Sequence, residues 1–278
     1  MQRDNPGGFF RLIQESGIVL CEQMISREEL LSLIKNMQNL NGFFCEKRIN
    51  MKMFNIFCLV VAMLGCESNE LLWVETFDHA DETKPEIFWS EGDKAEIRDG
   101  RLYVDADSTG YRASTVWFDK VFTGDISVKF DVQVVSSSDN ANNINFFFLY
   151  SDPSGRSLRR SAGERQGGQY SFYHQLNGYL FTNVTTSHDD EVGVRYRFRD
   201  NPGFEIIDER FTIGEKRGDV THQIKIVKKG SHFQYWIDGT LIFDLFDEKY
   251  NPVHDHGFLG LRTWHTSLWI DNLVVREY

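Results

Sequence analysis

The chain has 278 residues and a formal net charge of −11, with 26% charged and 41% hydrophobic residues. This composition is that of a globular protein and not of a disordered one. Because nucleic-acid phosphates require a basic surface, the negative charge argues against a nucleic-acid partner. The four cysteines, Cys21, Cys45, Cys58 and Cys66, all lie in the first 66 residues. The rest of the chain therefore offers neither a disulfide framework nor a thiol nucleophile.

Residues 1–50 precede the first feature of the chain that has a recognisable role. One interpretation is an extension that arises from translation upstream of the true start codon. The other is a small helical piece at "SREELLSLIKNMQNL", where Ser26 and Glu29 have the spacing of a capping box. Neither interpretation gives this region a part in the function.

A segment that starts at Met51 has the features of a secretion signal. Its sequence "MKMFNIFCLVVAMLGC" places Lys52 before an apolar run that ends at Gly65. A membrane-spanning helix needs about 20 residues, so this shorter run fits the apolar region of a signal peptide. A buried core helix is the alternative. The ending at Cys66 resembles a bacterial lipobox, in which the cysteine becomes the lipidated first residue. We therefore predict a signal over residues 51–66 and a secreted, periplasmic or outer-membrane lipoprotein of a bacterium, with the lipid as its only membrane anchor.

From Leu71 onward the hydrophobic pattern has a period of two, which is typical of strands. In "DISVKFDVQVV" the apolar residues on one face are Ile126, Val128, Phe130, Val132 and Val134. The pairs Asp99–Gly100 and Asp238–Gly239 are hairpin signals, because glycine supplies the positive φ that a tight turn needs. Short strands spaced by about 8–12 residues predict one all-β jelly-roll sandwich over residues 67–278.

Three stretches of the sequence resemble a known superfamily. They are "VETFDHADETKPEIFWSEGDKAEIRDGRLYVDA", the hairpin "FQYWIDGTLIFDL" and the closing "GFLGLRTWHTSLWIDNLVV". They are similar to the concanavalin A-like lectin/glucanase superfamily. With the central "YSFYHQLNG" and "VRYRFRDNPG", the chain looks most like the YesU-like domain-of-unknown-function proteins of polysaccharide-degrading bacteria. This resemblance implies a jelly roll that acts on plant or algal polysaccharides.

The segment "VGVRYRFR" predicts a strand with two unlike faces. One face carries Val192, Val194, Tyr196 and Phe198, and the other carries Gly193, Arg195, Arg197 and Arg199. Guanidinium groups bind carboxylate or sulfate in bidentate fashion, so the arginine face is a candidate site for an acidic saccharide. A solvated, charged strand face is the alternative. In the functional interpretation Arg195 is catalytic and Arg197 binds substrate.

The segment "GFLGLRTWHTSLWIDN" predicts a second strand that faces the ligand. Alternation separates Leu259, Leu261 and Thr263 from Phe258, Gly260, Arg262 and Trp264. An indole can stack on a sugar ring while a guanidinium binds its polar groups, so Arg262 and Trp264 are predicted to bind substrate. Packing of Trp264 at the rim is the alternative. His265 and Asn145 are further candidates for substrate contacts.

The segment "YSFYHQLNG" is predicted to be a strand. Alternation then places Tyr170, Phe172, His174 and Leu176 on one face, and Ser171, Tyr173, Gln175 and Asn177 on the other. The polar face is the better candidate for the cleft, so Tyr173 is predicted to be catalytic and Gln175 to bind substrate. His174 is a second catalytic candidate if a bulge reorients it, and a core histidine otherwise.

The residues favour elimination over hydrolysis. Hydrolysis by the usual route needs two carboxylates about 5–9 Å apart, and the Glu-x-Asp-x-(x)-Glu strand of the glucanases in this superfamily is absent. The nearest acidic cluster, "EIIDER", lacks that spacing. A uronate lyase needs a cation to neutralise the carboxylate and Tyr or His to move protons. We predict a polysaccharide lyase or glycoside hydrolase acting on an acidic, uronate-containing polysaccharide.

The alternative is a surface lipoprotein that binds carbohydrate without catalysis. The expected partner in both cases is an oligosaccharide or polysaccharide. No motif for a nucleotide, haem or zinc is visible, so we expect no cofactor and no metal ligands, although sandwiches of this kind can hold a structural calcium ion.

Overall fold

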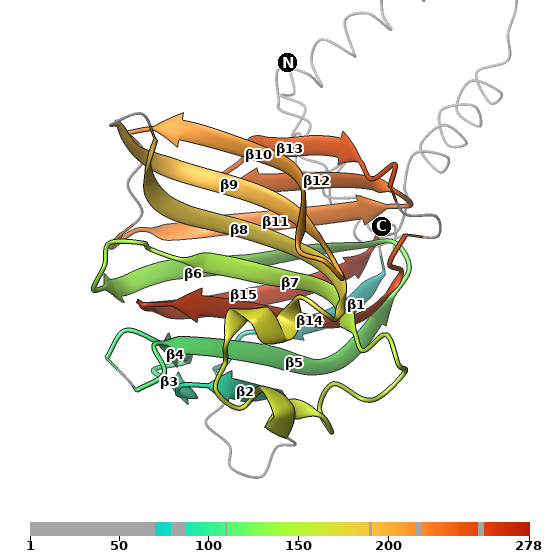
Figure 1. Cartoon of the computed structure of the whole chain (residues 1–278), viewed down its shortest axis with the longest axis horizontal. Helices are drawn as coiled ribbons and strands as arrows, with labels where there is room; N and C mark the ends of the chain where they lie inside the picture. The colour runs from blue at the N-terminus through green and yellow to red at the C-terminus, as the bar shows by residue number, and fades with distance from the viewer. Residues whose placement is uncertain (1–69, 79–86, 109, 189–190, 215–217, 250–252) are drawn as a thin grey trace, which may run out of the picture. The chain divides into compact units, whose positions relative to one another are not determined.

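The computed structural model describes residues 70–78, 87–108, 110–188, 191–214, 218–249 and 253–278 (Figure 1). These residues belong to one compact unit, Asn69–Tyr278. The predicted signal and the extension before it lie outside the described residues. The described part contains fifteen strands and two short 3₁₀ helices, and none of its helices is long and apolar enough to cross a membrane.

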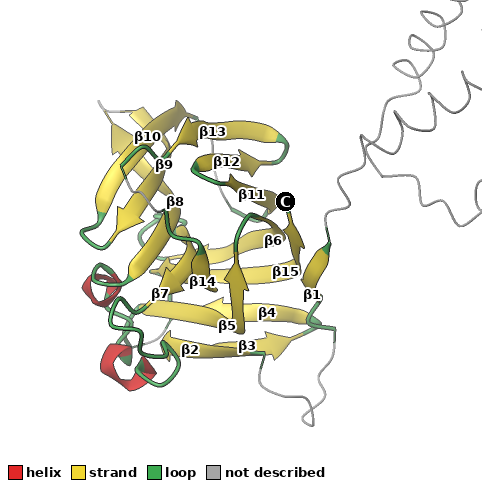
Figure 2. Cartoon of the chain, turned by 90° about the vertical axis from the view of Figure 1, so that its right-hand side faces the viewer, coloured by secondary structure: helices red, strands yellow, loops and turns green. Residues whose placement is uncertain are grey.

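The strands form two antiparallel sheets that are stacked as a sandwich (Figure 2). The seven-stranded sheet has the order β10-β9-β8-β7-β14-β5-β2. Its strands are β2 (Phe88–Gly92), β5 (Ala113–Thr123), β7 (Ile144–Ser151), β8 (Asn177–His188), β9 (Glu191–Asn201), β10 (Glu205–Ile213) and β14 (His256–Trp264). The eight-stranded sheet has the order β13-β12-β11-β6-β15-β4-β3, with β1 paired to β15. Its strands are β1 (Leu71–Glu75), β3 (Ala95–Arg98), β4 (Arg101–Asp105), β6 (Ile126–Ser137), β11 (Thr221–Lys229), β12 (His232–Ile237), β13 (Thr240–Phe246) and β15 (Thr266–Glu277).

The core between the sheets follows the predicted alternation. The inward residues of β6 are Ile126, Val128, Phe130, Val132 and Val134, and all are buried. The apolar residues of β9 (Val194, Tyr196, Phe198) and of β14 (Leu259, Leu261) belong to the same core cluster. Because successive side chains of a strand point to opposite faces, the residues that alternate with these apolar ones in β9 and β14 lie on the outer face of the seven-stranded sheet.

Both predicted hairpin turns are present. Asp238–Gly239 joins β12 to β13, and Asp99–Gly100 joins β3 to β4. All four residues have positive φ, between 51° and 76°. This is the backbone conformation of the two-residue turns that match the twist of the flanking strands. The all-β sandwich predicted from the sequence is confirmed.

The prediction of a strand at "YSFYHQLNG" is wrong. Residues Tyr170–Tyr173 form a 3₁₀ helix, η2, and strand β8 begins only at Asn177. With η1 (Ala162–Arg165), this helix belongs to the connection between β7 and β8, residues 152–176, which lies on the outer face of the seven-stranded sheet (Figure 2). Tyr173 and Leu176 belong to a second apolar cluster, formed with side chains of β5, β7 and β8. This burial stabilises a turn where local propensity favours a strand.

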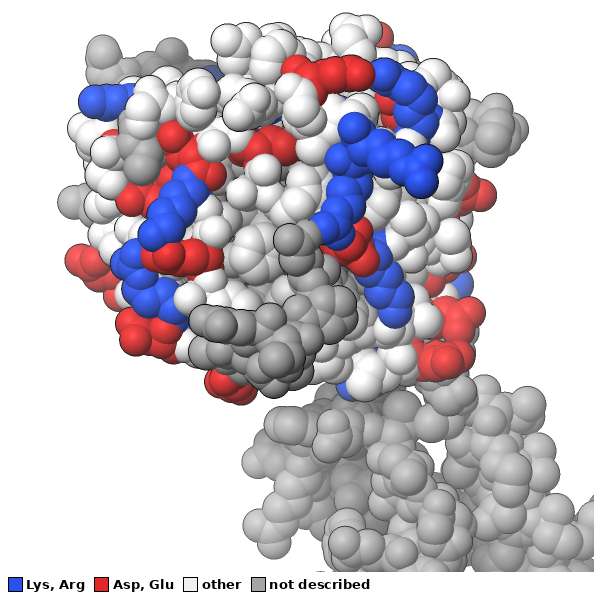
Figure 3. Space-filling view, turned by 90° about the horizontal axis from the view of Figure 1, so that it is seen from below, with Lys and Arg blue, Asp and Glu red and all other residues white. Residues whose placement is uncertain are grey.

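The charged side chains at the β2–β3 edge of the sandwich do not form a surface of one sign. Figure 3 shows this face, which is the bottom of Figure 1, with acidic groups lying among the basic ones. Ion pairs of this edge include Lys94 and Arg98 with Glu96, and Arg159 with Asp119.

Candidate functional site

A pocket of about 500 Å³ opens on the outer face of the seven-stranded sheet. Its volume lies in the range of roughly 300–1,000 Å³ that is usual for small-ligand sites. The residues that line it are Tyr111, Ala113, Asn143, Asn145, Gly167, Gln169, Tyr170, Thr182, Val184, Arg197, Arg199, Phe204, Arg262 and Trp264. Among the described residues, this lining contains three arginines and no carboxylate, in a chain whose net charge is −11.

Arg262 is the most buried of the three arginines, with 4% of its surface exposed. One guanidinium nitrogen donates to the carbonyl of Gly168 at 3.1 Å, and the guanidinium lies 4.3 Å from the centre of the Tyr170 ring. The Nε atom is buried without a hydrogen-bond partner. Burial lowers the pKa of Arg262. A desolvated cation with an unused donor and no carboxylate partner among the described residues favours binding of an anion.

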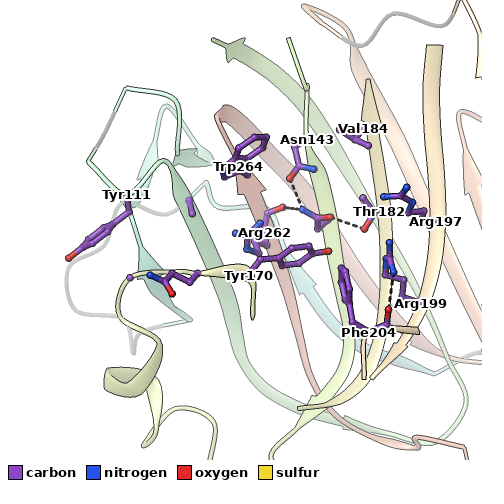
Figure 4. A pocket seen from close by; sticks show the side chains of 14 residues that line it. Tyr111, Asn143, Tyr170, Thr182, Val184, Arg197, Arg199, Phe204, Arg262 and Trp264 are labelled. Atoms are coloured by element: carbon purple, nitrogen blue, oxygen red, sulfur yellow. Dashed lines mark hydrogen bonds between the residues drawn. The ribbon is translucent and has the colours of Figure 1, made fainter. Parts of the chain in front are cut away.

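The arginines of β9 lie across the pocket from Arg262 (Figure 4). Arg199 donates to the carbonyl of Phe204 at 2.9 Å and stacks on its ring at 3.9 Å. Arg197 is paired with Glu209 of β10. Arg195 projects on the same face but does not line the pocket. The predicted arginine face of β9 therefore exists, and two of its three arginines, Arg197 and Arg199, line the pocket together with Arg262.

Amide and hydroxyl groups occupy the pocket floor between the arginines. Asn145 donates to Asn143 Oδ1 at 2.6 Å and to the carbonyl of Arg262 at 3.3 Å. It accepts a hydrogen bond from the Thr182 hydroxyl at 2.8 Å. Asn145 is 1% exposed, so these bonds fix its orientation. The structure thus brings Asn145, predicted from the sequence, next to Arg262.

Tyr170 lines one end of the pocket, between Arg262 and Phe204 (Figure 4). Its ring lies over Arg262, and its hydroxyl points toward Thr182 and the arginines of β9 (Figure 4). Burial raises the pKa of Tyr170, while Arg262, the Thr182 hydroxyl and the β9 arginines act in the opposite direction. The hydroxyl is therefore a proton donor at neutral pH, placed among cations that stabilise its conjugate base.

Tyr173 belongs to the β7–β8 connection and packs its side chain between the connection and the sheet, and it does not line the pocket. Its hydroxyl donates to Glu91 at 2.9 Å, and its side chain is fully buried. Arg165 of η1 donates to both oxygens of Glu91, at 2.7–3.1 Å. This buried group of three anchors the connection to strand β2. The placement of Tyr173 in the cleft is a wrong prediction, because it assumed strand alternation in a segment that forms a helix.

Gln175 and His174 also follow the helix instead of a strand. Gln175 is exposed and lies outside the pocket lining. The His174 ring stacks on Phe204 at 3.7 Å and contacts the edge of Tyr170 at 5.0 Å. Burial, Arg199 and Arg262 lower the pKa of His174. The His174 ring packs against Phe204 and Tyr170, which line the pocket, and does not line it itself. The positions of Gln175 and His174 therefore both differ from those that the predicted strand would give.

Trp264 lies at the other end of the pocket from Tyr170 (Figure 4). It is 43% exposed, and its ring packs against His265 at 4.2 Å. His265 has a φ of 47° at the turn between β14 and β15 and pairs with Asp139 at 3.5 Å. It does not line the pocket. The predicted pairing of Arg262 and Trp264 on one strand face is present.

Sequence reasoning missed most of the pocket lining, including the aromatic residues Tyr170 and Phe204. Tyr170 was assigned to an apolar strand face, and Phe204 follows the turn after β9 at "NPGF". A signal for Phe204 was the Asn-Pro-Gly turn next to the arginine strand, since residues after such a turn lie near the strand end. Tyr170 had no comparable signal, because its position depends on how the connection packs.

No group of three or more His, Cys, Asp or Glu side chains that could hold a metal ion is found within the described ranges. The groups that the pocket lining offers to a ligand are guanidinium, amide, hydroxyl and aromatic groups.

The two antiparallel sheets form a sandwich whose fold is similar to that of galectin-like proteins. A Bacillus subtilis protein of unknown function with a galectin-like fold is similar over 75% of this chain and 96% of its own, with 17% identity and a TM-score of 0.61. The carbohydrate recognition domain of Emp47p covers 77% and 99%, with 11% identity and a TM-score of 0.53. The endo-beta-1,3-glucanase of Pyrococcus furiosus covers 74% and 94%, with 12% identity and a TM-score of 0.50. At these identities the likeness concerns the fold alone.

The family is given by the sequence. The chain belongs to the family described as Domain of unknown function (DUF6250), whose family model matches residues 109–273. This range includes the complete lining of the pocket. No curated protein sequence matches the chain.

Proposed function

We propose that the pocket binds an acidic saccharide, a uronate-containing segment of a plant or algal polysaccharide. The single observation that carries this proposal is the set of three arginines without a carboxylate in the lining. Arginine forks match the planar carboxylate of a uronate and also a sulfate group. The amides of Asn143 and Asn145 and the indole of Trp264 add the hydrogen bonds and the stacking surface that a sugar ring uses.

The fold and the sequence resemblance support a saccharide over another anion. Emp47p and the Pyrococcus furiosus protein are named as a carbohydrate recognition domain and a glucanase. The central segments of this chain resemble the YesU-like proteins of polysaccharide-degrading bacteria. We extend this to location: residues 51–66 export the chain, and residues 67–278 work as a single carbohydrate-active domain tethered by lipid at Cys66.

The reaction that this pocket supports best is β-elimination. The arginines neutralise the uronate carboxylate and so acidify the proton on C5. The Tyr170 phenolate takes that proton, a C4–C5 double bond forms and the C4–O bond breaks. Tyr170 then returns the proton to the leaving sugar oxygen, so that no other reactant is consumed. The phenolate forms beside cations, and the raised pKa of Tyr170 places the activity at alkaline pH.

Hydrolysis by a carboxylate pair has no support from this pocket, since none of the described residues that line it carries a carboxylate. Binding without turnover is the second candidate. It is favoured by the position of the Tyr170 hydroxyl, which points toward Thr182 and the β9 arginines (Figure 4) and is protonated at neutral pH, as tyrosine ordinarily is. A protonated tyrosine donates a hydrogen bond to a sugar without removing its proton.

The test uses the full chain with polygalacturonate, alginate and chondroitin sulfate, over a range of pH. Elimination produces unsaturated uronates, which absorb in the ultraviolet, whereas hydrolysis produces reducing ends without that absorbance. Binding without either product identifies a binding protein. If no acidic polymer binds and none reacts, the proposal is wrong.

A matched pair of variants assigns the effect to the pocket. Arg262→Gln removes a buried cation, and hydrogen bonds to charged groups contribute about 1.5–3 kcal/mol. Affinity for the acidic polymer should therefore fall by about tenfold to a hundredfold. Arg210→Gln removes the same charge from an exposed position of β10 that pairs with Asp208. Arg210 faces away from the pocket, over Phe243, so its loss should leave affinity unchanged. Equal effects of the two variants would show that net charge alone matters.

A further inference from the structure

One end of the pocket is closed by contacts between two segments distant in sequence. The edge of the Tyr170 ring meets Phe204 with ring centres 5.0 Å apart. His174 stacks on Phe204 at 3.7 Å, and the amide of Gly203 donates to the carbonyl of His174 at 2.9 Å. The β7–β8 connection and the β9–β10 turn are thereby joined. We call Tyr170, His174 and Phe204 the end wall.

The end wall is fixed from below by the cations of the pocket. Arg262 lies under Tyr170, and Arg199 lies under Phe204 and also donates to its carbonyl. The Phe204 amide donates to Asn201 Oδ1 at 2.9 Å, which holds the turn itself. The closed end of the pocket is therefore also its most cationic end. An acidic group that binds to these arginines therefore lies against the end wall, which blocks a further sugar residue on that side.

The opposite end has a different character. Trp264, Asn143 and Val184 lie there, and none of them is charged (Figure 4). Trp264 is two residues further along β14 than Arg262, a step of about 7 Å along a strand. This step is on the scale of one sugar residue. The Trp264 face is 43% exposed and can accept a second ring.

From this arrangement we propose that the pocket recognises the terminal residue of an acidic saccharide chain and not an internal segment. The terminal uronate lies against the end wall with its carboxylate on the arginines, and the next sugar, bonded to its C4 oxygen, extends over Trp264. A chain that continues past the uronate on both sides would have to pass through Tyr170 and Phe204. The inference rests on the proposed function and specifies its ligand.

The test measures affinity by calorimetry for oligogalacturonates, alginate oligomers and chondroitin sulfate oligomers of one to six residues. Terminal recognition predicts that affinity stops rising, within about twofold, after two or three residues. A bulky fluorescent tag on one end should lower affinity by at least about tenfold, while a tag on the other end is tolerated. Affinity that rises through six residues, with both tags tolerated, would overturn the inference and leave the proposed function intact. Absence of binding by polymers and oligomers alike would overturn both.

Two variants locate the two ends. Trp264→Ala should lower affinity for di- and trisaccharides by about threefold to tenfold, the scale of one aromatic stacking contact. The affinity for the single uronate should fall by less than this, and an equal loss for both would contradict the arrangement. Phe204→Ala should restore binding of the tagged oligomer that the unmodified chain rejects. The tag comparison uses the unmodified chain, so it decides the matter even if Phe204→Ala does not fold.

Discussion

Replacement of Arg165 by methionine tests whether the ion pair beneath the β7–β8 connection holds the pocket in place. The Arg165 guanidinium donates to both oxygens of Glu91, to Ser161 Oγ at 3.0 Å and to the Leu158 carbonyl at 2.7 Å. The side chains of Arg165 and Glu91 are 5% and 1% exposed. Because both side chains are buried, water cannot replace the hydrogen bonds that Glu91 loses when Arg165 is substituted.

The expected loss is large compared with the total stability. Without Arg165, the Glu91 carboxylate retains the Tyr173 hydroxyl at 2.9 Å and a long contact from Trp89 at 3.4 Å. Removal of one partner from a buried ion pair costs about 3–5 kcal/mol, because the other charge stays buried. The free energy of unfolding of a domain is about 5–15 kcal/mol. Arg165→Met should therefore remove about a fifth or more of this free energy.

The assay is urea unfolding followed by circular dichroism, with affinity for the acidic polymer measured in parallel. Glu164→Gln, in the same 3₁₀ helix, is the control, because its pair with Arg156 is exposed and such pairs contribute about 0–1 kcal/mol. The double variant Arg165→Met with Glu91→Gln should recover part of the stability, since no unpaired charge remains. An Arg165→Met chain within about 1 kcal/mol of the unmodified one would refute this account of the connection.

Three further predictions concern the wall, the proton carrier and the sheet. Burial, Arg199 and Arg262 lower the pKa of His174, so its contribution to stability is present above about pH 6.5 and is lost as the pH falls through the folded-state pKa. His174→Phe should therefore reduce the drop in melting temperature that acid causes. An unchanged drop would exclude this histidine as its source. Tyr170→Phe should abolish formation of unsaturated uronate while changing affinity by less than about tenfold, roughly the value of one neutral hydrogen bond; retained elimination would show that another group moves the proton. Gly257→Ala places a Cβ 2.4 Å from the backbone of Leu149 at a φ of 151°, whereas the Cβ of Gly163→Ala has no atom within 4 Å. Urea unfolding should therefore show a free energy of unfolding lower by about 1–3 kcal/mol for Gly257→Ala only. Equal stability of the two variants would contradict this packing.

The faces of β9 and β14 could be read from the sequence because each strand is regular and one of its faces is plainly apolar. Burial of Phe198 and Leu261 in the core places Arg197 and Arg262 outside it, by the geometry of any strand. Hairpin signals such as Asp238–Gly239 are equally local, since a two-residue turn needs positive φ there. These predictions required no knowledge of distant contacts.

The β7–β8 connection could not be read in this way. Its shape depends on Glu91, which is 74 residues from Arg165 in the chain, and on a buried apolar cluster that receives Tyr173. A run of aromatic residues favours a strand locally, and only these distant contacts favour the helix. The assumed alternation therefore exchanged the roles of Tyr170 and Tyr173.

The sequence by itself determined the sandwich, its turns, and the outward direction of the arginines and Trp264, because strand alternation and turn chemistry are local. The tertiary structure decided that Arg197, Arg199 and Arg262 meet in one pocket without a carboxylate. It also decided that Tyr170, which lies over Arg262 and meets Phe204 edge-on, lines that pocket while Tyr173 does not. Both outcomes depend on long-range packing between strands and connections, which no local pattern encodes.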